Sequence, residues 1–346
     1  MNSRAEHQPH SAGFVVALPA VCAISILLGV ATCRASAQSC QTSGDLDDAT
    51  KSAITSSALH YFDLAAKGDA DAMRQSAIPS LASDFSSIEA TIKDHQADLS
   101  GAQAGARSVF VLQTEGSAPA AHTEFYCGVF GKSGQTSSSA VFYLDNLAPA
   151  KYAVAILDVT SPKGKLSFSP ILEQAGTEWK LGGLYVKSAQ IAGHDSDWFI
   201  AQARQAKAKG QLHNAWFFYL QARSMISPLP FMSTSLTDKL YDESQGARPA
   251  DVPADGKTAD LAAGAETYKL TAMFPEAVGN DLDLIVKYQS PDASNTNQAY
   301  QSNLAVMKAL AAKYPEIRDA FAAVVARAVD PSGRDYGTLL EMKDIK

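Results

Sequence analysis

The feature that most constrains the fold is a change in hydrophobic period near residue 100. Before it, apolar residues recur at helical spacing in segments 45–64, 69–77 and 84–98. After it the period becomes two, and turn residues separate the segments that we predict as strands: 108–114, 122–130, 140–144, 152–159, 165–172 and 177–186. Helices followed by a run of strands indicate the α+β class, with helices packed on one face of a curved antiparallel sheet.

Two more helices are predicted after the last of these strands, over about 196–209 and 212–225. Asp195 or Ser196 suits the N-cap of the first helix, because its side-chain oxygen can accept a free amide of the first turn. Gly210 suits its C-terminus, and Pro228 follows the end of the second helix. A single helical hairpin cannot bury its own apolar face, so we expect this pair to pack on the preceding sheet.

The last third of the chain predicts a second, smaller α+β unit. A short helix at 236–240 is followed by the Gly-, Pro- and Asp-containing stretch 245–258, which is typical of a linker. Beyond it the patterns predict strands at 268–271 and 282–288, a helix at 295–314, and a hairpin made of 321–329 and 336–342.

The N-terminal segment has the pattern of a secretory signal peptide. Arg4 precedes an apolar run over 14–31, and an A-x-A sequence ends at Ala37. We therefore expect cleavage after Ala37 and export to the periplasm or the medium, with no membrane span afterwards. The alternatives are an uncleaved membrane anchor, since the run could nearly span a bilayer, and a lipoprotein processed at Cys33.

Export also bears on the four cysteines. Cys22 and Cys33 would leave with the signal peptide, so that Cys40 and Cys127 remain. An oxidising compartment favours a disulfide between these two, which would join the start of the mature chain to an interior strand. The alternative is a pair of free thiols.

Two segments resemble known families. ILEQAGTEWKLGGLYVK, residues 171–187, resembles the last strand pair of the cystatin-like cone fold of the nuclear-transport-factor-like (SnoaL-like) superfamily, with Trp179, Lys180, Leu181 and Gly183 in the characteristic places. This resemblance covers about 45–190 and implies a pocket between sheet and helices. The chain departs from that family in placing three helices before the first strand, where the family threads a strand between helices two and three.

The helical hairpin at about 196–228 resembles a single tetratricopeptide unit, and an ordinary αα-hairpin is the alternative. The residues at the repeat's spacings are Ala203, Gly210, Ala215, Tyr219 and Ala222. The large residue expected near Gln202 is absent, and the chain has no second copy.

We therefore expect five parts: signal peptide 1–37, cone-like α+β domain 38–190, helical hairpin extension 191–244, linker 245–265 and C-terminal α+β domain 266–346.

Charge and motifs argue against several functions. The net charge of −7 disfavours nucleic acid and anionic lipid as partners. His194, Asp195 and Asp197 cluster without metal-ligand spacing, and helix capping explains them, so we expect no metal. The chain has no glycine-rich phosphate loop and no G-x-S-x-G motif, and we expect no cofactor and no enzymatic activity.

The leading hypothesis is an exported binding or interaction protein of the cell envelope, with a small apolar ligand or a protein as partner. Exposed aromatic residues mark partner sites, so the candidate binding residues are Phe218 and Tyr219 of the hairpin and Tyr126. For the hairpin aromatics, packing in a core or between domains is the favoured alternative.

The resemblance to the cone fold also implies a pocket in which an Asp or His moves protons, so the first alternative is a small-molecule enzyme of the isomerase or dehydratase type. Its catalytic candidates are His122, Asp145 and Tyr143. A pocket filled by Phe125, Phe142 and Leu144 would remove that site. The second alternative is a structural envelope protein.

Overall fold

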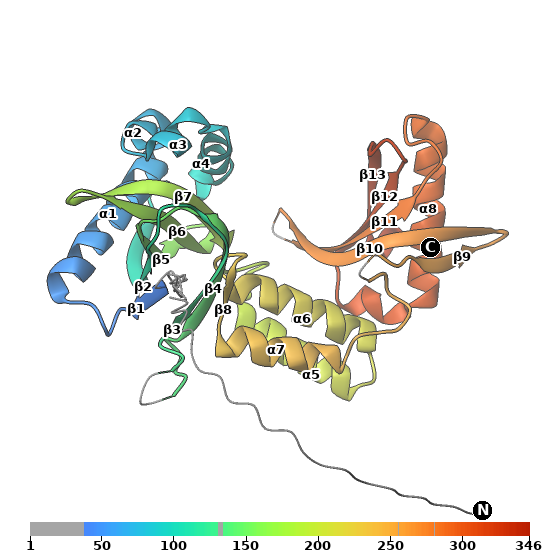
Figure 1. Ribbon diagram of the computed structural model, residues 1–346. Helices are drawn as coiled ribbons and strands as arrows, with labels where there is room; N and C mark the ends of the chain where they lie inside the picture. Colours follow the sequence, from blue (N-terminus) through green and yellow to red (C-terminus); the bar gives the residue numbers. More distant parts are fainter. Residues whose placement is uncertain (1–37, 131–133, 255, 280) are drawn as a thin grey trace, which may run out of the picture. The chain divides into compact units, whose positions relative to one another are not determined.

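The computed structural model of the protein describes residues 38–130, 134–254, 256–279 and 281–346 (Figure 1). The expected signal peptide over 1–37, with Cys22 and Cys33, lies outside the described residues. Helices and three mostly antiparallel sheets make up the fold, so the predicted α+β class is confirmed. Within the described ranges, no helix combines the length and the apolar character needed to cross a membrane.

The first sheet is five-stranded, and helices α1–α4 cover one of its faces (Figure 1). Asp47 caps α1 by accepting the amide of Thr50, and Gly68 ends α1 with a left-handed backbone at φ 71°. The helices are α1 Asp48–Lys67, α2 Ala70–Gln75, α3 Pro79–Ser83 and α4 Ser86–Leu99. The strands, in spatial order, are β1 Gln38–Thr42, β2 Gln103–Thr114, β5 Lys151–Ser161, β6 Gly164–Ala175 and β7 Glu178–Ser188.

The other two predicted strands, β3 (Ala120–Cys127) and β4 (Ala140–Leu147), do not join this sheet. They pair with each other and with the short β8 (Met232–Ser233) in a separate three-stranded sheet. The expectation of one curved sheet that includes all six strands is therefore wrong. The reason lies in β5, whose residues 152–157 are all buried, so that the first sheet needs cover on both faces: helices on one, and β3 and β4 on the other.

The space between the two sheets is filled with side chains. Phe125 and Phe142 are fully buried there, and Leu144 packs against the same cluster. The ring of Phe142 lies 5.1 Å from that of Phe110 on β2. A disulfide between Cys40 on β1 and Cys127 on β3, with a Cα–Cα distance of 5.0 Å, joins the two sheets covalently and confirms the predicted pairing.

A helical group and a third sheet follow. The helices are α5 Ser196–Ala208, α6 Leu212–Ile226 and α7 Ser235–Gln245. The strands lie in the order β13-β12-β11-β10-β9, with β9 Ala259–Ala263, β10 Glu266–Val278, β11 Asp281–Gln289, β12 Ala323–Val329 and β13 Asp335–Glu341. β11 and β12 pair in parallel, and α8 (Thr296–Lys313) and the 3₁₀-helix η1 (Pro315–Asp319) connect them; a second 3₁₀-helix, η2 (Met342–Asp344), follows β13.

Helices α5–α7 share their hydrophobic core with this third sheet, which corrects the expectation that the hairpin packs on the preceding sheet. Phe217 of α6 lies against Phe321, with ring centroids 5.8 Å apart. Ala247 and Val252, in the stretch expected to be a linker, are buried in the same core. The physical reason is the composition of α6, whose residues 214–219 are all buried, so that one neighbouring element cannot cover it.

Candidate binding surface on β3 and β4

The sequence candidates from β3 and β4 come together on the face of the hairpin that points away from the first sheet. Successive side chains of a strand alternate between faces, so Phe125 and Cys127 point inward while His122, Glu124 and Tyr126 point outward. In the antiparallel register His122 stands opposite Asp145, and Glu124 stands opposite Tyr143. We call this surface the outer face; its residues are His122, Glu124, Tyr126, Phe130, Tyr143 and Asp145.

Both ring nitrogens of His122 contact carboxylates. Nδ1 lies 2.7 Å from Oδ1 of Asp145, and Nε2 lies 3.3 Å from Oε1 of Glu124. Two hydrogen bonds raise the pKa of His122 above its usual value: the one with Asp145 has the larger effect, and the one with Glu124 the smaller. The hydrogen bond from Tyr126, followed by the one from His122, lowers the pKa of Glu124. His122 therefore has no free ring nitrogen with which to take a proton from a substrate.

Three large exposed aromatic side chains lie on the Glu124 side of this histidine: Tyr126 and Tyr143 beside Glu124, and Phe130 against Tyr126. Tyr126 is 45% exposed, Tyr143 is 43% exposed and Phe130 is 82% exposed. The rings of Tyr126 and Phe130 are 5.5 Å apart, and the Tyr126 hydroxyl donates a hydrogen bond to Glu124, which raises the pKa of Tyr126. Exposed aromatic groups gathered in one place are typical of a contact surface.

The expected catalytic pocket is not at these residues. His122, Tyr143 and Asp145 lie on the solvent side of the hairpin, and the space behind them is filled by Phe125, Phe142 and Leu144. The sequence predicted candidates that do lie together, but it placed them in a cavity instead of on an exposed face. Burial is one way in which enzymes shift the pKa of a general acid or base, and these side chains are exposed instead.

The expected docking residues of the helical hairpin are buried. Phe218 is 7% exposed and Tyr219 is 1% exposed. Phe218 packs against the rings of Trp198 and Phe199, and the Tyr219 hydroxyl donates to Glu243 of α7 at 3.3 Å. α5, α7 and the third sheet cover α6, so these two residues cannot form the surface that we expected.

The cluster near His194 serves the local structure. The ring of His194 stacks on Trp198 at 3.8 Å, and Asp195 caps α5 by accepting the Trp198 amide at 3.1 Å. In the part of the chain that the structure describes, no group of three His, Cys, Asp or Glu residues could hold a metal ion.

Sequence reasoning missed two members of the outer face, Glu124 and Phe130. The signal for Glu124 was present, because the alternation that places His122 and Tyr126 on one face of β3 also places Glu124 there. The same alternation, continued through the predicted strand 122–130, also reaches Phe130, although β3 itself ends at Cys127.

Comparisons with known proteins give no family for this chain. No family model, no curated protein and no solved structure matches it. The resemblances to the cone fold and to a tetratricopeptide unit therefore gain no support from relatives.

Proposed function

We propose that the protein is an exported binding protein of the cell envelope, and that the outer face of β3 and β4 docks a basic segment of a partner protein. One observation carries the proposal: the exposed Tyr126 and Tyr143 share one face of the β3–β4 pair with the carboxylates of Glu124 and Asp145, and the exposed Phe130, just beyond β3, lies against Tyr126.

The chemistry of this face suits arginine and lysine. A guanidinium or ammonium group is attracted to the face of an aromatic ring, and Tyr126, Phe130 and Tyr143 offer three rings. Glu124 and Asp145 add two carboxylates, which hydrogen-bond strongly to a guanidinium. Among the residues that the structure describes, His122 is the one cationic group that contacts these carboxylates, so an acidic or neutral apolar partner would give them no second cation.

His122 makes this docking dependent on pH. A protonated His122 offsets part of the negative charge of Asp145 and Glu124, whereas a neutral one leaves that charge to the partner. Because the pKa of His122 is raised, we expect affinity for a basic segment to increase as the pH rises through that pKa.

Two features support export. The Cys40–Cys127 disulfide is of the kind that persists in oxidising compartments, and the N-terminal apolar run followed by an A-x-A sequence has the pattern of a secretory signal.

Fluorescence anisotropy with a labelled Arg-Val-Arg-Val-Arg-Val peptide tests the docking. We expect binding by the unaltered protein, and weakening of roughly fivefold or more when Tyr126→Ala and Tyr143→Ala are combined, since each exposed cation–π contact contributes about 0.5–1 kcal/mol. Tyr300→Ala is the matched control, because Tyr300 is 42% exposed and lies on α8.

Equal affinity in the double variant and in the control would refute docking at the outer face. The preference for a basic segment would be refuted if a Glu-Val-Glu-Val-Glu-Val peptide bound as tightly as the basic peptide and the double variant no longer bound it. If the protein bound neutral oligosaccharides but neither peptide, the outer face would be a glycan-binding surface and not a docking site for a basic segment.

A further inference from the structure

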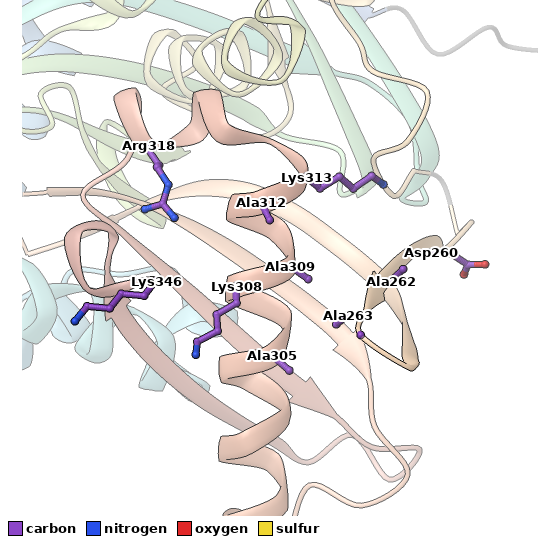
Figure 2. A pocket seen from close by; sticks show the side chains of 11 residues that line it. Asp260, Ala262, Ala263, Ala305, Lys308, Ala309, Ala312, Lys313, Arg318 and Lys346 are labelled. Carbon is purple, nitrogen blue, oxygen red and sulfur yellow. The ribbon is translucent and has the colours of Figure 1, made fainter.

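A groove of about 920 Å³ lies on the outer side of α8, next to β9 (Figure 2). Most of its lining consists of alanines and cations, with Asp260 and Gly264 in addition. The alanines are Ala262 and Ala263 from β9 and Ala305, Ala309 and Ala312 from α8; the cations are Lys308, Lys313, Arg318 and Lys346.

The arrangement follows from the spacing along α8. Residues 305, 308, 309, 312 and 313 recur at the intervals that place side chains on one helical face, and the buried residues Val306, Met307 and Leu310 occupy the opposite face. Figure 2 shows Ala305, Ala309 and Ala312 on the side toward β9, with Lys308, Arg318 and Lys346 on the other flank of the helix. The groove therefore has a floor of methyl groups and a cationic flank.

The positive charges of the groove are only partly neutralised by acidic groups of the protein. Asp260, the one acidic residue of the lining, is engaged by Lys269 at 3.2 Å. Lys313 faces Asp251 at 3.5 Å, and Arg318 donates to the carbonyl oxygens of Met342 and Ile345. Lys308 makes no ion pair with any residue that the structure describes. A basic groove on a chain with a net charge of −7 is complementary to an acidic partner.

The groove also lies along an edge of the third sheet. β9 is the last strand in the sheet order and pairs with β10 alone among the described strands. Every second residue of such a strand turns its N–H and C=O groups toward the open side, which makes the edge a template for one more strand. Ala262 and Ala263 point to opposite faces of β9, and their small side chains keep both faces beside this edge shallow.

We propose that this groove is a second binding site, in which an extended acidic segment of a partner protein adds to β9 as a further strand. Main-chain hydrogen bonds to β9 supply affinity, and the cations beside α8 select acidic side chains, as in other cases where a peptide extends a sheet. The alanine floor limits the segment to side chains that fit a shallow surface. This site is separate from the outer face of β3 and β4, and either can fail without the other.

The test uses the Glu-Val-Glu-Val-Glu-Val peptide with a fluorescent label, read by anisotropy at low and at physiological salt. We expect binding that weakens with salt, and that falls about tenfold or more in Lys308→Glu, since like charges brought together at an interface cost several kcal/mol. Lys51→Glu, an exposed lysine on α1, is the matched control with the same change in net charge.

A second peptide separates strand addition from charge attraction alone. N-methylation of alternate amides keeps the charges but removes the donors on one edge, and we expect binding to be lost for one of the two methylation registers. Unchanged binding in both registers would overturn strand addition. Equal affinity in Lys308→Glu and Lys51→Glu, or no binding up to about 1 mM peptide, would overturn the site itself. The variant with both tyrosines replaced should bind this peptide normally.

Discussion

At the scale of single residues, the outer face is governed by His122. A histidine between two carboxylates gains a proton more readily than one in water, because both neighbours favour the cation. The raised pKa also has a consequence for stability. The ion pairs contribute fully below the usual value for histidine, and the contribution is lost as the pH rises through the raised value in the folded protein.

Asp145→Asn should lower the pKa of His122, because it removes the charged partner of the shorter hydrogen bond. Titration of the His122 ring signals by NMR measures the change directly. Asp158→Asn is the control, since Asp158 lies on β5 and pairs with Arg107. If the pKa of His122 is the same in both variants, the hydrogen bond with Asp145 does not raise that pKa.

At the scale of elements, the important unit is the β3–β4 hairpin, which the chain folds over the first sheet. Two kinds of contact hold it there: the packing of Phe125 and Phe142, and the disulfide from Cys127 to Cys40. The packing fixes the direction of the outward side chains, because a strand with one face buried cannot rotate without exposing its apolar residues.

Loss of the disulfide should lower the free energy of unfolding by about 4 kcal/mol, since the bond closes a long loop in the unfolded chain. The sequence separation of its cysteines is 87 residues. Urea unfolding of residues 38–346, with and without a thiol reductant, measures the effect. The variant with Cys40→Ser and Cys127→Ser should match the reduced protein and should not respond to the reductant. A reductant effect in that variant would assign the loss to another cause.

At the scale of the whole molecule, the described chain has separate hydrophobic cores. One lies between α1–α4 and the first sheet, one lies between the first sheet and the β3–β4 hairpin, and one is shared by α5–α7, α8 and the third sheet. His213 of α6 strengthens the last of these, because its ring nitrogens lie 2.9 Å from Glu316 and 2.9 Å from Asp251. The packing that stabilises the helical hairpin is therefore its packing against α8 and the third sheet.

Phe217→Ala should destabilise the protein by about 3–5 kcal/mol, as expected for a large aromatic side chain removed from a core. Hydrogen exchange read by mass spectrometry locates the loss. We expect faster exchange in α5–α7 and in β10–β12, where Phe217 shares a core, and unchanged protection in β5 and β6. Faster exchange in β5 and β6 would instead show that the helical hairpin is stabilised by packing on the first sheet.

The sequence alone determined most of the elements and the residue types that they carry. The Asp195 cap and the change of period after residue 100 act over a few residues, so helices such as α5, α6 and α8 were predicted close to their observed bounds. In contrast, β1, α3 and β9 were not predicted, and β10 was predicted too short. The pairing of Cys40 with Cys127 followed from elimination.

Only the tertiary structure decided which surfaces are covered. In the sequence Phe218 and Tyr219 are candidates for docking, but α5, α7 and the third sheet bury them. Tyr143 is a candidate for a pocket, but its side chain on β4 is exposed to solvent. Burial of a side chain depends on elements far away in the sequence. Local patterns predict which strand or helix forms, but the face that it presents to solvent follows from the sum of all the packing contacts.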